Sequence, residues 1–326
     1  MSDKESDLYR LLDPQMAAAL QRMREIAAEL GPPASQIAAI RQQAQQSREW
    51  WNQGGPQMAE VREATVPGTV RDVPIVIYRP TLDAHLPVYV YLHGGAYRIG
   101  NQWTNDRQMR ELAHDWGGVV ISADYQHMPE SVFPAAVEEI ACVYQMLAEF
   151  GPRWDVDGSR IAFGGSSAGA NIATGAAVQL GGVQTGFLKA AALVVAVLDQ
   201  DTQTQSMRRF GNGEFFPSYE DAVETGTGYL PDPTRRSDPR VDCVRAPAKI
   251  FPPMFLGAAE LDAFSDSSRH MAAHLDTAGV PHELKIYRGM VHQFFGCSRM
   301  VNAARECVSD MAKFLRKYLP VEVDRG

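Results

Sequence analysis

The sequence predicts a doubly wound α/β fold, in which a mostly parallel sheet carries helices on both faces. Three observations lead to this expectation. Short apolar runs alternate with helical patterns along most of the chain, as they do in α/β domains. These runs are almost continuously apolar, which is typical of parallel strands that are buried on both faces. The length of 326 residues suits one large domain, so we expect residues 1–326 to form a single unit.

Six runs are predicted to be parallel strands, because they are rich in β-branched or aromatic residues and most are bounded by Gly, Pro or Asp. They cover residues 88–92, 118–123, 160–163, 191–197, 254–258 and 283–287. Helical spacing follows between and after them, at about 104–115, 135–149, 168–180, 265–278 and 300–318. Upstream, residues 61–66 and 74–78 are predicted to form an antiparallel pair, joined at the Pro67-Gly68 turn.

Two segments lie outside this alternation. Residues 1–55 carry helical patterns at 8–12, 16–30 and 37–51 before any strand. The connection from 199 to about 253 is rich in Gly, Pro and aromatic residues, and connections of that length are usually functional. We expect a helical cap over one edge of the sheet, formed by residues of about 1–55 and about 199–250.

Composition and charge exclude several function classes. The net charge is −8 and no Lys/Arg run is present, which argues against nucleic acid as a partner. The longest strongly apolar stretch, residues 190–198, is too short for a membrane span. The polar, acidic start MSDKESDLYRLLD does not resemble a signal peptide, so we expect a cytoplasmic protein. Four cysteines without C-x-x-C spacing are expected to be reduced thiols with no metal site.

The stretch R-I-A-F-G-G-S-S-A-G-A-N, from residue 160 to residue 171, indicates a nucleophilic serine. The pattern G-x-S-x-G centres on Ser167, whereas centring it on Ser166 would require a glycine where Ala168 stands. A nucleophile elbow is a sharp turn between a strand and a helix, and it needs small neighbours because the two backbones nearly touch. The alternative is a glycine-rich turn with an incidental serine.

A second glycine motif follows the first parallel strand. H-G-G-A-Y at residues 93–97 is similar to the H-G-G-G loop, whose backbone N–H groups face a developing oxyanion. The expected donors are the amides of Gly94, Gly95, Ala96 and Ala168. We expect His93 to brace this loop rather than to act as a base, since it precedes the serine in the chain.

The predicted base is His292, because it lies just past the last strand, where a loop can reach the elbow. His282 leads into that strand. His270 and His274 lie four residues apart on a predicted helix, but no glutamate stands between them and no third ligand is evident. We therefore interpret His270 and His274 as surface or packing residues.

The predicted acid is Asp262, at the head of the loop after the strand at 254–258. Glu260 and Asp266 are the alternatives, and for each of the three carboxylates a solvated or helix-capping role is the competing interpretation. Asp266 in particular is expected to cap the helix that begins nearby.

Together these residues resemble the hormone-sensitive-lipase family of α/β-hydrolases, the bacterial family IV esterases. D-Y-Q-H-M-P-E at residues 124–130 and F-P-A-A at 133–136 are similar to the D-Y-R-L-A-P-E and F-P-A-A block of that family. Y-L-P-D-P at 229–233, D-P-R at 238–240, A-E-L-D at 259–262 and G-M-V-H at 289–292 match its further motifs in order. The chain departs from the family at Ser166, Ala170, Ala263 and Gln293, and none of these changes removes a catalytic group.

The resemblance implies an eight-stranded α/β-hydrolase fold and a carboxylesterase that needs no cofactor or metal. Ser167 would attack an ester carbonyl, His292 would accept its proton, and Asp262 would orient His292. We expect a small ester substrate with a short or compact acyl group, because bulky cap residues are expected to restrict the site. The predicted pocket residues are Tyr97, Phe215 and Phe216, and the bulky cap residues also include Tyr9, Trp50, Trp51 and Tyr219.

Other activities remain open at this point. An amidase, a lactonase or a carbamate hydrolase would use the same three residues. A receptor without catalysis is disfavoured, because related receptors lose the catalytic histidine and His292 is present. Monomer and homodimer are both compatible with the sequence.

Overall fold

The computed structural model describes residues 8–32 and 34–321, and an eight-stranded sheet forms its centre. The strands lie in the spatial order β1-β2-β4-β3-β5-β6-β7-β8. β2 pairs antiparallel with β1 and β4, and every other pairing is parallel. The predicted fold class is confirmed. The bounds are β1 Glu60–Pro67, β2 Asp72–Arg79, β3 Val88–Leu92, β4 Val119–Ala123, β5 Ile161–Ser166, β6 Leu188–Val194, β7 Met254–Ala259 and β8 His282–Tyr287.

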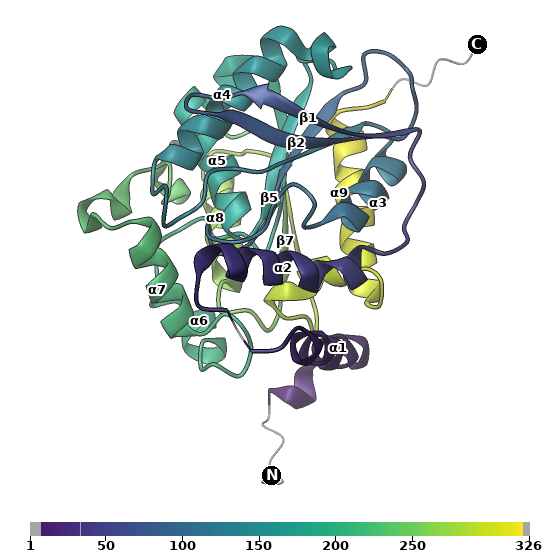
Figure 1. Cartoon of the computed structure of the whole chain (residues 1–326). Coiled ribbons are helices and arrows are strands. Elements are labelled where there is room, and N and C mark those ends of the chain that lie inside the picture. Colours follow the sequence, from purple (N-terminus) through teal and green to yellow (C-terminus); the bar gives the residue numbers. More distant parts are fainter. Residues whose placement is uncertain (1–7, 33, 322–326) are drawn as a thin grey trace, which may run out of the picture.

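Helices cover both faces of this sheet (Figure 1). On one face, α4 (Ala135–Phe150), α5 (Ala168–Leu180) and α8 (Ser265–Asp276) contribute to one buried apolar cluster. On the other face, α3 (Asp106–Trp116) and α9 (Asn302–Tyr318) contribute to a second cluster. The sheet is therefore buried on both sides, as the apolar strand sequences predict.

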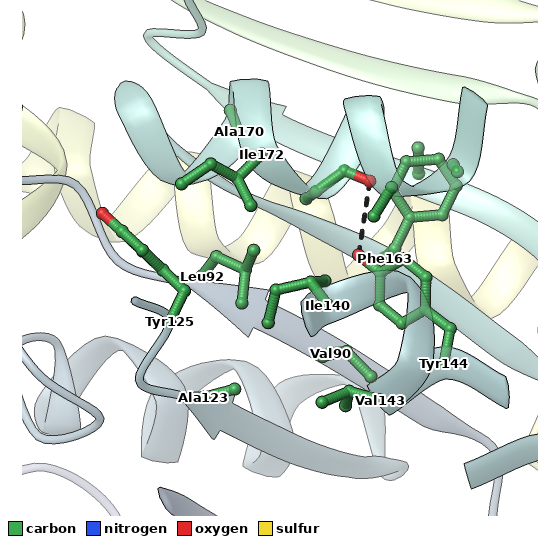
Figure 2. Packing of buried hydrophobic residues seen from close by; sticks show 14 of the residues in the cluster. Val90, Leu92, Ala123, Tyr125, Ile140, Val143, Tyr144, Phe163, Ala170 and Ile172 are labelled. Atoms are coloured by element: carbon green, nitrogen blue, oxygen red, sulfur yellow. Dashed lines mark hydrogen bonds between the residues drawn. The ribbon is translucent and has the colours of Figure 1, made fainter. Parts of the chain in front are cut away.

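The sequence V-Y-V-Y-L of β3 shows how a strand serves two cores. Side chains alternate between the faces of a sheet. Val90 and Leu92 accordingly pack in the cluster beneath α4 and α5, which Figure 2 shows from close by. Tyr89 and Tyr91 enter the opposite cluster, where both side chains are fully buried. The carboxyl end of β3 thus places residue 93 at the edge of the sheet.

Three predicted boundaries are wrong in detail. The strand predicted at 191–197 begins earlier, at Leu188, because pairing with β5 begins there, and it ends at Val194, since Val195 has a φ of 45°. β5 continues to Ser166, because its glycines pair with both neighbouring strands. The turn between β1 and β2 spans residues 68–71, closed by a bond from the amide of Gly68 to the carbonyl of Arg71.

The two segments outside the alternation are largely helical in the part of the chain that the structure describes. The N-terminal segment forms α1 (Pro14–Leu30) and α2 (Ile37–Asn52), and residues 1–7 of the predicted cap lie outside the described residues. The connection after β6 contains α6 (Gln205–Phe210) and α7 (Tyr219–Tyr229). In Figure 1 these four helices gather at one end of the molecule. This end carries the cavity described below.

Two further sequence predictions concern the thiols and the membrane. The four cysteines are free thiols, and three of them are buried. Within residues 8–32 and 34–321, the structure contains no helix with the length and apolarity that a membrane crossing requires.

Candidate active site

Ser167 stands at a sharp turn between β5 and α5. Its φ of 54° and ψ of −122° lie in a region that non-glycine residues rarely adopt, so the surrounding structure must hold this strained backbone in place. Gly165 and Gly169 explain how. A Cβ atom on either glycine would lie only 2.3 or 2.2 Å from the carbonyl oxygen of Leu92. Only glycine fits at these two positions, as the G-x-S-x-G pattern predicts.

The structure brings Ser167, His292 and Asp262 together in one hydrogen-bonded series. The Oγ of Ser167 lies 2.8 Å from Nε2 of His292, and Nδ1 of His292 lies 2.7 Å from Oδ2 of Asp262. Asp262 is 1% exposed and His292 is 6% exposed. Because the second oxygen of Asp262 accepts the amide N–H of Phe264 at 2.9 Å, the carboxylate is held from both sides. A serine, an imidazole and a buried carboxylate in this order can generate a nucleophilic alkoxide.

The two other candidate acids have different partners. Glu260 accepts the amide N–H of Gly289 at 2.8 Å, which ties the loop after β7 to the loop after β8. Asp266 accepts the amide N–H of Ser206 at 2.8 Å, in the first turn of α6. The expectation that Asp266 caps its own helix is therefore wrong. α8 has no side-chain cap, and the carboxylate satisfies a free amide at the start of α6 instead.

The loop after β3 is shaped by unusual backbone angles. Gly95 has a φ of 141°, and a Cβ there would lie 2.0 Å from the carbonyl oxygen of Ile99. Ala96 and Tyr97 follow with φ values of 53° and 57°. This strained turn lies beside the serine, since a Cβ on Gly94 would lie 3.3 Å from the Cβ of Ser167.

The structure corrects one of the four predicted oxyanion donors, the amide of Gly94. Its amide N–H donates to the Oγ of Ser166 at 3.0 Å, so this donor is already occupied. The amides of Gly95 and Ala96 lie in the strained turn. Ala168 begins α5, where the first amides lack an intrahelical acceptor. These three amides remain the candidate donors.

Ser166 connects this loop to a buried polar series that the sequence analysis does not identify. Its hydroxyl lies 2.9 Å from the hydroxyl of Tyr91, which donates to Oδ1 of Asn105 at 2.9 Å. The side-chain N–H of Asn105 then donates to Oε1 of Gln108 at 3.2 Å. Burial raises the pKa of Tyr91 well above its ordinary range, so the phenol keeps its proton as a donor. The sequence signal for this hydrogen-bonded series is the presence of polar residues on the apolar strand β3 and at the start of α3.

A cavity of about 970 Å³ opens onto Ser167 and His292. It is near the upper end of the size range of about 300–1,000 Å³ for small-molecule sites. Its wall includes side chains of α1, α2 and α7, so both expected cap segments contribute to it. Of the predicted pocket residues, Tyr97 and Phe216 line this cavity. The ring of Tyr97 stacks on Tyr229 at 3.8 Å, and the ring of Phe216 lies 6.2 Å from that of His292.

Phe215 is placed elsewhere, and the prediction that it lines the pocket is wrong. Its side chain is 5% exposed and packs at 5.2 Å against the ring of Tyr9. Of the six bulky cap residues, Trp51, Phe216 and Tyr219 line the cavity. The side chains of the neighbouring residues Phe215 and Phe216 thus lie in different surroundings.

The cavity wall also contains a cation that the sequence analysis does not identify. The guanidinium of Arg48, on α2, donates to the carbonyl oxygens of Thr104 at 3.1 Å and Gly296 at 2.7 Å. Burial lowers the pKa of this guanidinium. Because its partners are neutral carbonyls, Arg48 leaves a positive charge beside the cavity while it joins α2 to the loops after β3 and β8.

The remaining histidines after the serine have structural partners. His270 lies 2.9 Å from Asp199, and Nε2 of His274 lies 2.8 Å from the carbonyl of Ala246. Nδ1 of His282 lies 3.0 Å from the carbonyl of Val280. These contacts agree with a packing or surface role.

Comparison with known proteins gives consistent results. A family model described as the alpha/beta hydrolase fold matches residues 89–296. A hyperthermophilic esterase from the archaeon Pyrobaculum calidifontis is similar, with 27% identity, a TM-score of 0.85 and coverage of 94% of this chain and 98% of the other. A thermostable esterase from Pseudomonas putida shares 25% identity with a TM-score of 0.86, over 98% of this chain and all of the other. A thermostable carboxylesterase cloned from a metagenomic library shares 28% identity with a TM-score of 0.83, over 87% of this chain and 98% of the other.

Proposed function

The chain belongs to the α/β-hydrolase fold family, on its hormone-sensitive-lipase branch, and from this premise we propose that it is a serine carboxylesterase acting through Ser167, His292 and Asp262. The observation that carries the assignment of residues is the pair of hydrogen bonds, at 2.8 and 2.7 Å, that joins these three side chains, of which Ser167 and His292 line the cavity. The esterases named above, which this chain resembles along most of its length, support the reaction class.

The first half of the reaction follows from this arrangement. His292 removes the proton from Oγ of Ser167 while the oxygen attacks the ester carbonyl. Asp262 holds Nδ1–H of His292, which keeps Nε2 free to accept the proton and stabilises the imidazolium. The amides of Gly95, Ala96 and Ala168 stabilise the oxyanion. When the C–O bond to the alcohol breaks, His292 gives its proton to the leaving oxygen.

The second half uses water as the nucleophile. His292 takes a proton from water, the hydroxide attacks the acyl-enzyme, and the proton returns to Ser167 as the acid leaves. The carboxylic acid and the alcohol are the only products, so the cycle consumes one water and restores the enzyme.

We further propose that the preferred acyl group is short or compact. Phe216 and Phe264 lie with their rings 6.2 and 5.7 Å from that of His292, so bulk is placed next to the reacting centre. Each added methylene gains about 0.8 kcal/mol from burial, whereas overpacking a filled site costs about 1–3 kcal/mol. By this balance kcat/KM peaks at roughly four to six acyl carbons and falls towards palmitate. Because the cavity has a volume of about 970 Å³, it still offers some room to longer acyl groups, so kcat/KM declines gradually with chain length.

Kinetics on a series of nitrophenyl esters tests both proposals. Wild-type protein should hydrolyse acetate to hexanoate esters, and Ser167→Ala should lower kcat by on the order of 10⁴-fold. A fluorophosphonate should label Ser167, with Ser166 as the internal control in the same peptide. Labelling of Ser166 would contradict the nucleophile, and a rate that still rises through laurate and palmitate would contradict the acyl preference. Faster hydrolysis of a matched anilide, lactone or carbamate would reassign the substrate class.

A further inference from the structure

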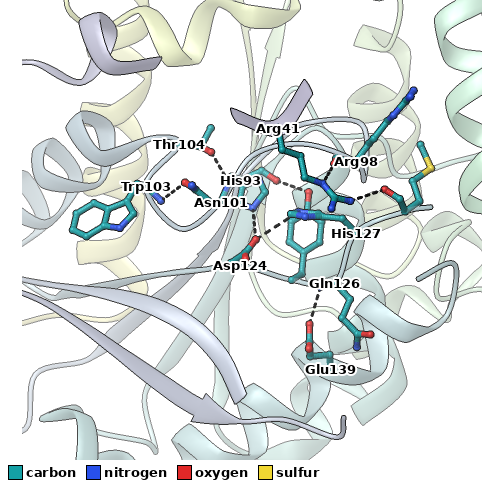
Figure 3. Close-up of polar contacts among 12 residues, drawn as sticks. Arg41, His93, Arg98, Asn101, Trp103, Thr104, Asp124, Gln126, His127 and Glu139 are labelled. Atoms are coloured by element: carbon teal, nitrogen blue, oxygen red, sulfur yellow. Dashed lines mark hydrogen bonds and ion pairs between the residues drawn. The ribbon is translucent and has the colours of Figure 1, made fainter. Parts of the chain in front are cut away.

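Three side chains behind the oxyanion loop, one fully buried and two partly buried, direct polar atoms without hydrogen-bond partners at one point. They are Nε2 of His93, Oδ1 of Asp124 and Nε2 of His127, which all lie within 4.8 Å of one another. Oδ1 of Asp124 is 3.5 Å from the nitrogen of His93 and 3.6 Å from that of His127. None of the three atoms has a hydrogen-bond partner, and His93 is fully buried. Figure 3 shows the carboxylate of Asp124 between the two rings.

The contacts of His93 leave its Nε2 as the ring atom that faces the other two side chains. Nδ1 of His93 lies 2.9 Å from the carbonyl oxygen of Gly94, and a carbonyl only accepts, so Nδ1 carries the ring proton. Its Nε2 faces Oδ1 of Asp124 at 3.5 Å. Buried polar atoms require a partner, and an ion at this point would contact all three of these atoms at once.

We propose that His93, Asp124 and His127 bind a divalent zinc ion through these three atoms. Two imidazoles and one carboxylate are ligands that zinc accepts, with a fourth position left for water. Zinc bonds of about 2.0–2.1 Å in a tetrahedron imply about 3.3–3.4 Å between ligand atoms. The separations of 3.5 and 3.6 Å from Asp124 are close to this value, and the two histidine nitrogens lie within 4.8 Å of each other, so a small movement of the rings would complete the tetrahedron.

The ring of His93 is held in the orientation that a metal ligand needs. Its Nδ1–H contact with the carbonyl of Gly94 is the kind of outer contact that fixes the tautomer of a metal-binding histidine. Tyr125 stacks on the ring at 4.7 Å and donates its hydroxyl to the carbonyl of His93 at 3.0 Å. Gly100 completes the enclosure, because a Cβ there would lie 2.4 Å from Nδ1.

Nearby cations have their own acidic partners. Arg71 is paired with the buried Glu139 at 2.9 Å and comes only within 3.9 Å of the other oxygen of Asp124. Arg41 makes two bonds to Glu130, at 2.9 and 2.6 Å. Asp124 therefore shares Arg71 with Glu139, and a divalent ion in contact with Oδ1 would offset its charge at closer range.

The role of this ion would be structural. It would join the loop after β3, which carries the oxyanion donors, to the loop after β4. The spacing Asp124-x-x-His127 is a feature of this chain, since the D-Y-R-L-A-P-E block that it resembles has leucine at the position of His127. The site uses none of the three residues proposed for ester hydrolysis, so the two proposals can fail independently.

Metal analysis of the full-length protein tests the inference. Chelator-treated protein should take up about one equivalent of zinc from zinc chloride, measured by mass spectrometry of the metal after dialysis. At free zinc a hundred times the dissociation constant, Tm should rise by about 4 °C. His127→Leu should abolish both the uptake and the rise. His114→Gln, which removes an exposed histidine that lies 3.1 Å from Asp115, should change neither.

The controls keep the result decisive. Circular dichroism of the zinc-free His127→Leu protein shows whether it is folded, and Asp124→Asn provides a second variant that should also lose the uptake. Folded wild-type protein that takes up no stoichiometric zinc would overturn the proposal. Equal uptake by wild type and both variants would overturn it as well, because zinc would then bind elsewhere.

Discussion

The hydroxyl of Ser166 accepts a hydrogen bond from the amide of Gly94 at 3.0 Å, and this bond joins the nucleophile elbow to the loop after β3. Adjacent serines in the elbow thus have separate surroundings. Ser167 faces His292, whereas Ser166 faces Tyr91 and the oxyanion loop. The bond also explains why Gly94 is not a free donor for an oxyanion.

We predict that Ser166→Ala leaves the nucleophile in place but weakens the loop. The change leaves the amide of Gly94 without its acceptor and removes one of the two partners of the Tyr91 hydroxyl, which still donates to Asn105, and this costs about 1–3 kcal/mol of stability. The fall in kcat should be far smaller than for Ser167→Ala. Urea unfolding and nitrophenyl butyrate kinetics measure the two effects. Ser166→Thr keeps the hydroxyl and is the matched control, so equal losses in both variants would contradict a role for the hydrogen bond.

Substitution of Asp262 should mainly lower catalysis, whereas substitution of Asp266 should mainly lower stability. Asp262→Asn should lower kcat by on the order of 10⁴-fold, because an amide no longer fixes the correct tautomer of His292. Asp266→Asn should mainly weaken the contact with Ser206, at a cost of about 1 kcal/mol in unfolding free energy. Steady-state kinetics and urea unfolding on both variants provide the comparison. A reversed pair of phenotypes would show that the acid is misassigned.

Gly169→Ala should disrupt the elbow. The new Cβ would lie 2.2 Å from the carbonyl oxygen of Leu92, which cannot move without shifting β3. We expect a loss of about 3 kcal/mol in stability and a large fall in kcat. Gly226→Ala is the control, because the new Cβ meets nothing within 4 Å in α7 and alanine favours a helix by about 0.5–1 kcal/mol. Normal stability of Gly169→Ala by thermal unfolding would contradict the close approach.

Asp238 should contribute to stability in a pH-dependent manner. The hydrogen bond from Arg240 holds the pKa of this carboxyl well below its ordinary value of 3.8. A carboxyl with a lowered folded-state pKa stabilises the protein above its unfolded pKa, and the contribution is lost as the pH falls through the folded pKa. Asp238→Asn should therefore destabilise the protein at pH 7 more than at pH 3, measured by urea unfolding. An equal loss at both pH values would exclude the ion pair as the cause.

The sequence predicts well which side chains meet beside the cavity, because that information is local. G-x-S-x-G requires small residues at fixed positions around one serine, and the register alone separates Ser167 from Ser166. The order of strands, together with loops at their carboxyl ends, favours His292 and Asp262 over the other candidates, and these are the two side chains that the structure joins to Ser167. Alternating apolar runs likewise predict the sheet, and the family that the motifs resemble is confirmed by the matching family model and the similar structures.

The tertiary structure decides what depends on contacts between distant segments. Phe215 and Phe216 are neighbours in the chain, yet one packs on Tyr9 and the other lines the cavity, since the orientation of each ring follows from packing. Asp266 satisfies an amide 60 residues away rather than its own helix. The grouping of His93 with Asp124 and His127 exists only because β3 and β4 are adjacent and parallel. Patterns along the chain determine which residues each element offers, whereas burial and pairing in space determine which polar atoms meet.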